Sequence, residues 1–126
     1  MTIQEIEKIN KQFQSKALLL SELIPRTDML EFGTLLRRKS VEIHQLFEML
    51  IRTNAMASFW RTLEKMEEVM DDLVYELDRL HDLNNMMKIN QVGDFIKNGY
   101  DMLSIYSISS DQVVKQKAAE VIKKSK

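Results

Sequence analysis

Residues 56–80, which read MASFWRTLEKMEEVMDDLVYELDRL, carry the clearest pattern in the sequence. Large apolar side chains recur there at alternating steps of three and four residues, and this spacing places them along one side of an α-helix. The repeat consists of Met56, Phe59, Leu63, Met66, Met70, Leu73, Leu77 and Leu80. Continued over roughly 30 residues, it predicts an amphipathic helix about 45 Å long whose apolar side is buried against neighbouring helices.

Two apolar stripes with the same spacing precede this segment, and a weaker one follows it. The first consists of Ile3, Ile6, Phe13, Ala17, Leu20 and Ile24, with Asn10 as its one polar interruption. The second consists of Met29, Phe32, Leu36, Lys39, Ile43, Leu46 and Leu50. The weaker stripe runs through Val92, Ile96 and Leu103, in a helix expected from about Ile89 to Tyr106. Pro25 separates the first two stripes, because proline lacks the backbone N–H that a continuing helix needs.

Three residue pairs have the spacing of a capping box at a helix start. In such a box, two side chains three residues apart each accept a hydrogen bond from the other residue's backbone N–H. The pairs are Thr2 with Glu5, Asp28 with Glu31, and Ser109 with Gln112. The third pair lies in the stretch SISSDQ at residues 107–112, where we expect a break before a short last helix.

The composition favours an all-α fold. Three glycines and one proline are too few for an all-β protein, which needs a turn every 8 to 12 residues or so. The apolar fraction of 44% and the charged fraction of 29% are ordinary for a globular protein. Short connections between amphipathic helices favour antiparallel neighbours. We therefore predict a single domain over residues 1–126, folded as an up-and-down antiparallel four-helix bundle with a short additional C-terminal helix.

The sequence also indicates a compartment. It contains no cysteine, which excludes disulfides and thiolate metal sites and fits a reducing environment. Its first residues, MTIQEIEKIN, carry charges where a signal peptide requires an apolar run. No window approaches the roughly 18 consecutive apolar residues of a membrane-spanning helix. We expect a cytoplasmic protein without a membrane span.

Charge is unevenly distributed along the sequence, although the net charge is only −1. Residues 64–82 hold eight acidic and two basic residues, whereas residues 115–126 hold five lysines and one glutamate. A basic run at 37–39 lies within the second predicted helix. Because the basic residues are dispersed over several helices, we expect no nucleic-acid partner. The charged faces are either solvated, paired within the chain through Glu67 and Glu76, or used to bind a protein partner.

The two histidines do not make a convincing catalytic or metal-binding set. A di-metal bundle needs two Glu-x-x-His pairs, whereas here Val41 precedes His44 by three residues and only Asp78 with His81 has the spacing. We therefore expect no metal and no other cofactor. One alternative is a histidine phosphotransfer-type signalling bundle in which His44 accepts a phosphoryl group. The carboxylate of Glu48, one turn later, would repel that phosphate.

Apolar residues outnumber the predicted core positions. Leu18, Leu19 and Leu20 point in three adjacent directions, so they cannot all face one groove. Either the stripes drift, because 3.6 residues per turn does not match a strict 3.5-residue repeat, or a second apolar face meets another chain. We predict a non-enzymatic adaptor or structural interaction module that binds a protein partner and self-associates as a homo-oligomer. The candidate interaction surface comprises Leu18, Leu19, Arg37, Arg38, Lys39, Glu64, Glu68, Asp71 and Asp78.

Overall fold

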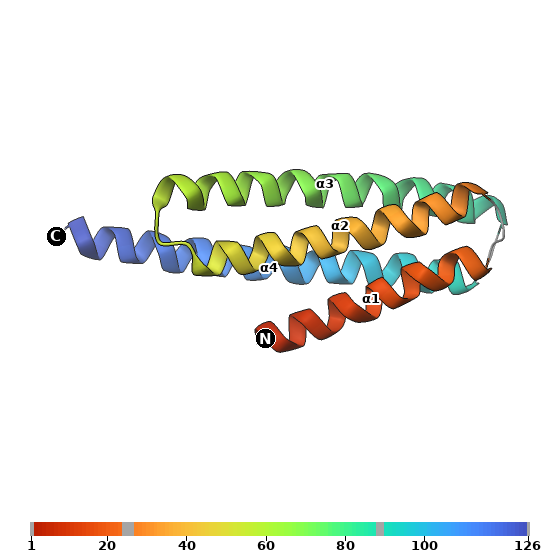
Figure 1. Ribbon diagram of the computed structural model, residues 1–126, viewed down its shortest axis with the longest axis horizontal. Helices are drawn as coiled ribbons and strands as arrows, with labels where there is room; N and C mark the ends of the chain where they lie inside the picture. The colour runs from red at the N-terminus through yellow and green to blue at the C-terminus, as the bar shows by residue number, and fades with distance from the viewer. Residues whose placement is uncertain (1, 24–26, 88–89, 126) are drawn as a thin grey trace.

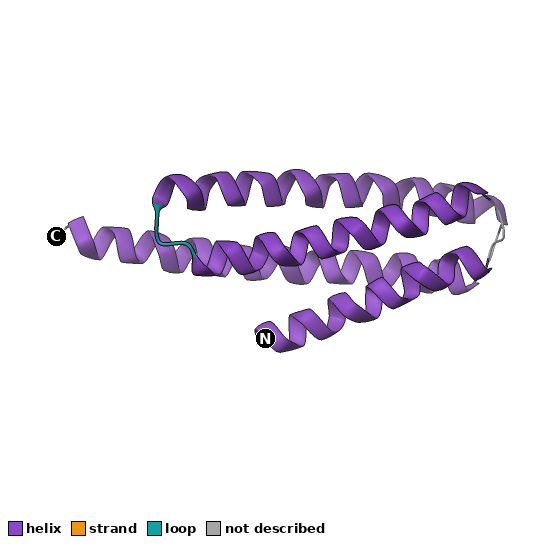
Figure 2. Cartoon of the chain, in the orientation of Figure 1, coloured by secondary structure: helices purple, strands orange, loops and turns teal. Residues whose placement is uncertain are grey.

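The computed structural model describes residues 2–23, 27–87 and 90–125. Side chains at positions 20–31, 86–91, 122 and 124–126 lie outside this description. Four α-helices account for nearly all of the described residues, which contain no strand (Figure 2). The helices are α1 (Ile3–Leu23), α2 (Thr27–Arg52), α3 (Met56–Met87) and α4 (Asn90–Ser125). The predicted all-α class is confirmed.

The four helices lie side by side along the long axis of the molecule (Figure 1). Asn10 of α1 contacts Ser40 of α2, whereas Ala17, two turns further along α1, faces Gly33. Residue numbers therefore rise along α1 as they fall along α2, and Figure 1 shows each later helix reversing direction in the same way. Helix α1 packs on α2 and α4, and within the described ranges it brings no Cα atom within 8 Å of α3.

The predicted stripes supply most of the core. Every helix contributes large apolar side chains with less than a tenth of their surface exposed, and burying one such side chain contributes about 1.5–3 kcal/mol. The buried apolar residues are Ile6, Phe13, Ala17, Phe32, Leu36, Ile43, Phe47, Leu50, Phe59, Met66, Val69, Leu73, Leu77, Leu80, Val92, Phe95, Ile96, Met102, Leu103 and Tyr106.

The buried side of α3 does not coincide with the predicted stripe, because a strict 3.5-residue repeat turns slowly around a straight helix with 3.6 residues per turn. Val69 and Thr62 are buried although both lie beside the predicted stripe, whereas Leu63 and Met70 on the stripe are half-buried. This drift explains some of the surplus apolar residues. It does not explain Leu18 and Leu19, which remain about half exposed, or the two stripe residues at helix starts, Ile3 and Met56.

The first of the predicted capping boxes can be compared with the structure, whereas the second lies outside the described side chains. The capping box at the start of α1 is confirmed: the backbone N–H of Thr2 donates to Glu5 Oε2 and that of Glu5 donates to Thr2 Oγ1, both at 3.2 Å. Helix α2 begins at Thr27, but the side chains of the Asp28–Glu31 pair lie outside the described residues. The side chains of Leu20, Ile24, Met29 and Ile89 do so as well.

The predicted break at 107–112 is wrong, and with it the separate short C-terminal helix. Helix α4 runs without interruption from Asn90 to Ser125. Serine breaks helices when its hydroxyl competes for backbone groups, but the hydroxyl of Ser110 donates to the carbonyl oxygen of Tyr106 at 2.7 Å, one turn back in the same helix. The same hydroxyl lies 3.5 Å from Met66 Sδ on α3. The serine is thus satisfied without ending the helix.

Two glycines allow the helices to approach closely. A Cβ atom on Gly33 would lie 2.6 Å from the backbone oxygen of Ala17, and one on Gly99 would lie 2.9 Å from both terminal methyl groups of Leu77. At Gly33, the backbone of α1 therefore fills the space that a side chain on α2 would need. Gly93 differs, because a Cβ atom there would meet its nearest neighbour, Asn84 Nδ2, at an ordinary 3.6 Å.

No described helix contains an 18-residue stretch apolar enough to cross a lipid bilayer.

Replacing Gly33 by alanine is expected to lower the free energy of unfolding by about 1–3 kcal/mol, because α1 must move away from α2. The matched variant Gly93→Ala is expected to raise it by up to about 1 kcal/mol, the gain in helix propensity. Urea denaturation of both variants measures the difference. Equal stabilisation by the two substitutions would show that α1 and α2 do not meet as closely as described.

Candidate functional site

A buried asparagine lies at the centre of the apolar side of α1. Asn10 is 1% exposed, and an amide in such a position is costly to bury unless it is hydrogen-bonded. Its Nδ2 group donates to the backbone oxygen of Ser40 on α2 at 2.9 Å and to Tyr106 Oη on α4 at 2.8 Å. One side chain thereby connects the three helices α1, α2 and α4.

Further polar side chains extend this contact in both directions. Gln14 Nε2 donates to Asn10 Oδ1 at 2.5 Å, and His44 Nδ1 lies 2.8 Å from Tyr106 Oη. Because Tyr106 Oη already accepts from Asn10, its own hydrogen is available to donate to His44 Nδ1. We call Gln14, Asn10, Tyr106, His44 and Glu48 the polar network.

The network ends at a carboxylate near the surface. His44 Nε2 is itself buried and lies 3.0 Å from Glu48 Oε1, but it makes no hydrogen bond. The Glu48 carboxylate is therefore close to His44 Nε2 without being hydrogen-bonded to it. Glu48 is also 3.6 Å from the Arg52 guanidinium, one turn further along α2.

The electrostatic surroundings keep the phenol of Tyr106 protonated. Burial is the largest influence and raises its pKa well above the ordinary value, while the hydrogen bond from Asn10 acts in the opposite direction. The charges of Glu7 and Glu48 raise the pKa further. The hydroxyl therefore remains a hydrogen-bond donor for His44.

The geometry around His44 gives little access to a phosphoryl donor. The side chain is 14% exposed, its Nδ1 is bonded to Tyr106, and its Nε2 is buried against Glu48. A ring nitrogen must reach phosphorus to accept a phosphoryl group, and here Nδ1 is bonded to Tyr106 and Nε2 is buried. The other histidine, His81, is exposed on α3.

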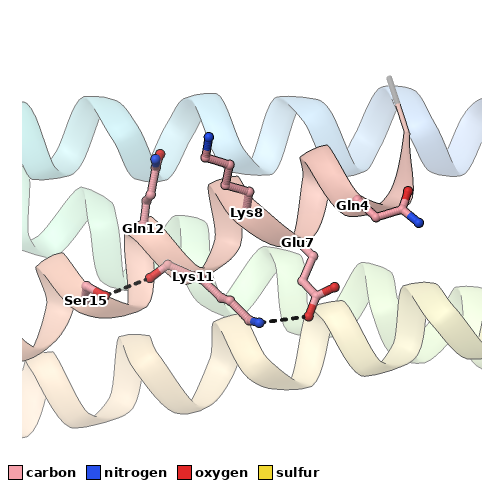
Figure 3. Close-up of a pocket in the computed structure, with 6 residues that line it drawn as sticks. All are labelled: Gln4, Glu7, Lys8, Lys11, Gln12 and Ser15. Atoms are coloured by element: carbon pink, nitrogen blue, oxygen red, sulfur yellow. Dashed lines mark hydrogen bonds and ion pairs between the residues drawn. The ribbon is translucent and has the colours of Figure 1, made fainter.

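No metal site is found in the described part of the chain. Within residues 2–23, 27–87 and 90–125, no three His, Asp or Glu side chains gather closely enough to hold a metal ion. A shallow hollow lies on the outer side of α1 (Figure 3), and its lining residues all come from that one helix. They are Gln4, Glu7, Lys8, Lys11, Gln12 and Ser15. Lys11 pairs there with Glu7 at 3.1 Å, so the hollow brings together no set of catalytic groups.

The basic run on α2 divides into exposed and partly buried members. Arg37 and Arg38 are exposed, whereas the Lys39 side chain is only 24% exposed and its Nζ lies 3.2 Å from Asp72 Oδ2 on α3. The lysine therefore covers apolar surface with its stem and pairs within the chain at its tip. Its partner is Asp72, and Glu76 instead pairs with Arg79 of its own helix at 3.3 Å.

The acidic candidates lie on the outer side of α3, where all of them are exposed. Glu68 lies 3.6 Å from Lys65, and Asp78 accepts a hydrogen bond from the hydroxyl of Tyr100 on α4. Burial, followed by the hydrogen bond and charge of Asp78, raises the pKa of Tyr100 to about 12. Glu64 and Asp71 complete the predicted set. The structure thus places the acidic candidates together on α3, away from Leu18 and Leu19 on α1.

Sequence reasoning missed the polar network apart from its weak signal at Asn10. That residue interrupts an otherwise apolar stripe, which indicates a buried polar contact but not its partners. Ser40 is buried beside it and takes part through its backbone oxygen, which no side-chain pattern can indicate. The sequence also gave no reason to single out Trp60, which is 53% exposed.

Comparison with known proteins finds no matching family model and no significant similarity to a curated protein or to a solved structure.

Removing the hydroxyl of Tyr106 tests the polar network. The Tyr106→Phe substitution leaves His44 Nδ1 and one Asn10 hydrogen without partners, so the free energy of unfolding should fall by about 1–3 kcal/mol. Tyr75 is 61% exposed, and Tyr75→Phe is a matched control that should change the stability by less than about 0.5 kcal/mol. Chemical denaturation of the two variants gives the comparison. Equally small effects would contradict the network.

Proposed function

We propose that this chain is a small, non-enzymatic, up-and-down antiparallel bundle of the cytoplasm that acts through protein–protein contacts and associates with itself. The observation that supports the proposal is the number of large apolar side chains left at the surface. Leu18, Leu19, Met49, Trp60, Tyr75 and Ile108 are each between 48% and 61% exposed. Single exposed apolar residues are common on proteins, but a large exposed aromatic with apolar neighbours is typical of an interface.

The arrangement of charge also suits a contact function. The outer side of α3 is acidic, while Arg37 and Arg38 and the last turns of α4 are basic. Complementary charges of this kind bring partners together quickly and fix their orientation more than they add affinity. The phosphotransfer alternative at His44 receives no such support, since neither ring nitrogen faces solvent freely.

Sedimentation velocity at micromolar concentrations tests the self-association. We expect the weight-average mass to exceed that of one chain and to rise with protein concentration. The apolar contacts should persist at high salt, whereas contacts made only by surface charges should weaken. A strict monomer throughout the concentration range would contradict the proposal.

A further inference from the structure

The contact between α3 and α4 shows which residues share their common outer edge. Asp78 of α3 accepts a hydrogen bond from Tyr100 of α4 on this edge. Eighteen residues complete about five turns of an α-helix, so residues that far apart point in the same direction. Trp60 precedes Asp78 by this interval, and Ala118 follows Tyr100 by it. Helices α3 and α4 run in opposite directions. We therefore expect Trp60 and Ala118 to lie level with each other on the same outer edge, near the start of α3.

Between these points the hydroxyl of Ser110 on α4 lies 3.5 Å from Met66 Sδ on α3. At the start of α3, Met56 and Trp60 are 39% and 53% exposed, and on α4 Ala118 is exposed and Val121 is 38% exposed. We call these four residues the seam patch. Helix α1 does not reach this end of the molecule, and α4 extends beyond the first turn of α3 (Figure 1). The indole of Trp60 is oriented by an edge-to-face contact with the buried ring of Phe59, with 5.4 Å between the centroids.

Charged residues border the seam patch with opposite sign on its two helices. Glu64 lies one turn after Trp60 on α3, and Asp82 follows Glu64 by eighteen residues. Lys115 lies one turn before Ala118 on α4, and Lys97 precedes Lys115 by eighteen residues.

All four charged side chains are exposed. The antiparallel register puts Glu64 level with Lys115, and Asp82 level with Lys97. Between Lys97 and Lys115 the exposed residues Asp101 and Asp111 offset the charge of the two lysines, whereas the five lysines and one glutamate of residues 115–126 make the C-terminal end of α4 basic.

We propose that the seam patch is the surface through which the chain associates with itself, and that its occupant is the seam patch of a second copy. This inference rests on the proposed self-association and adds its location and symmetry. A two-fold axis parallel to the helices stacks α3 of each copy on α4 of the other at the same level. Glu64 and Asp82 then face Lys115 and Lys97 of the second copy, and Trp60 covers its Ala118.

The charges select this symmetry over the other two-fold arrangement. An axis across the helices would place α3 on α3, with the acidic edges of residues 64–82 against each other. Like charges placed opposite one another in an interface cost several kcal/mol, so that arrangement is disfavoured.

The first experiment compares two substitutions of equally exposed apolar residues by sedimentation velocity. Trp60→Glu should weaken self-association at least about tenfold, as loss of a central aromatic in an interface does. Leu19→Glu, at a position 51% exposed on α1, should associate like the unmodified chain. Circular dichroism checks that both variants are folded. If Leu19→Glu dissociates the protein and Trp60→Glu does not, self-association stands and the seam patch is the wrong surface. If the unmodified chain is already monomeric, the proposed function fails as well.

The second experiment exchanges the charges and tests the symmetry. One variant carries Glu64→Lys and Asp82→Lys, and the other carries Lys97→Glu and Lys115→Glu. Each variant alone should associate at least about tenfold more weakly, because like charges then face each other across the two-fold axis. An equimolar mixture should recover association, since each exchanged residue then faces a residue of opposite sign. A mixture as weakly associated as its components would overturn the proposed arrangement.

Discussion

The hydrogen bonds of the buried Asn10 amide determine where α1 lies along α2 and α4. A buried donor without a partner costs about 1–3 kcal/mol, so α1 is most stable at the height where both the Ser40 carbonyl and the Tyr106 hydroxyl are within reach. The apolar contacts of Ile6 and Phe13 do not demand this, because hydrophobic burial is non-directional and tolerates sliding. Apolar burial therefore holds the bundle together, and the hydrogen bonds of Asn10 fix how α1 is aligned within it.

The alignment of α1 also determines which surfaces remain open. With α1 seated on α2 and α4, Gly33 allows α1 to approach α2 closely, and no Cα atom of α1 lies within 8 Å of α3 in the described residues. The outer side of α3 is left to solvent with its acidic residues and with Trp60. The buried polar network and the exposed seam patch therefore have different roles. The network specifies the fold of one chain, and the patch is available for contact between chains.

Much of this architecture follows from the sequence, because it depends on local periodicity. The stripe between Phe59 and Leu80 predicts the buried side of α3, and the spacing of Thr2 and Glu5 predicts the start of α1. The prediction that failed concerns a local hydrogen bond within α4. The break near Ser110 was expected because serine competes for backbone groups, yet its hydroxyl is satisfied by the preceding turn.

The candidate site was less predictable than the fold. Lys39 pairs with Asp72 instead of Glu67 or Glu76, because the choice depends on how far α2 and α3 rotate against each other, which the spacing of either helix does not contain. In the same way, only the packing of α4 against α1 brings Tyr106 to Asn10. The exposure of the acidic residues of α3 follows from the sequence, because they lie opposite the apolar stripe. Trp60 directly follows the buried Phe59, so it points away from the apolar stripe and is 53% exposed.

The most direct test of the central claim is a nuclear Overhauser measurement on the side-chain amide of Asn10 in ¹⁵N-labelled protein. If Asn10 aligns α1 as described, its Nδ2 protons show contacts to the aromatic ring of Tyr106 and to backbone protons around Ser40. An Asn10 amide that shows none of these contacts, and that exchanges with water as fast as the exposed amide of Gln12, would contradict the account.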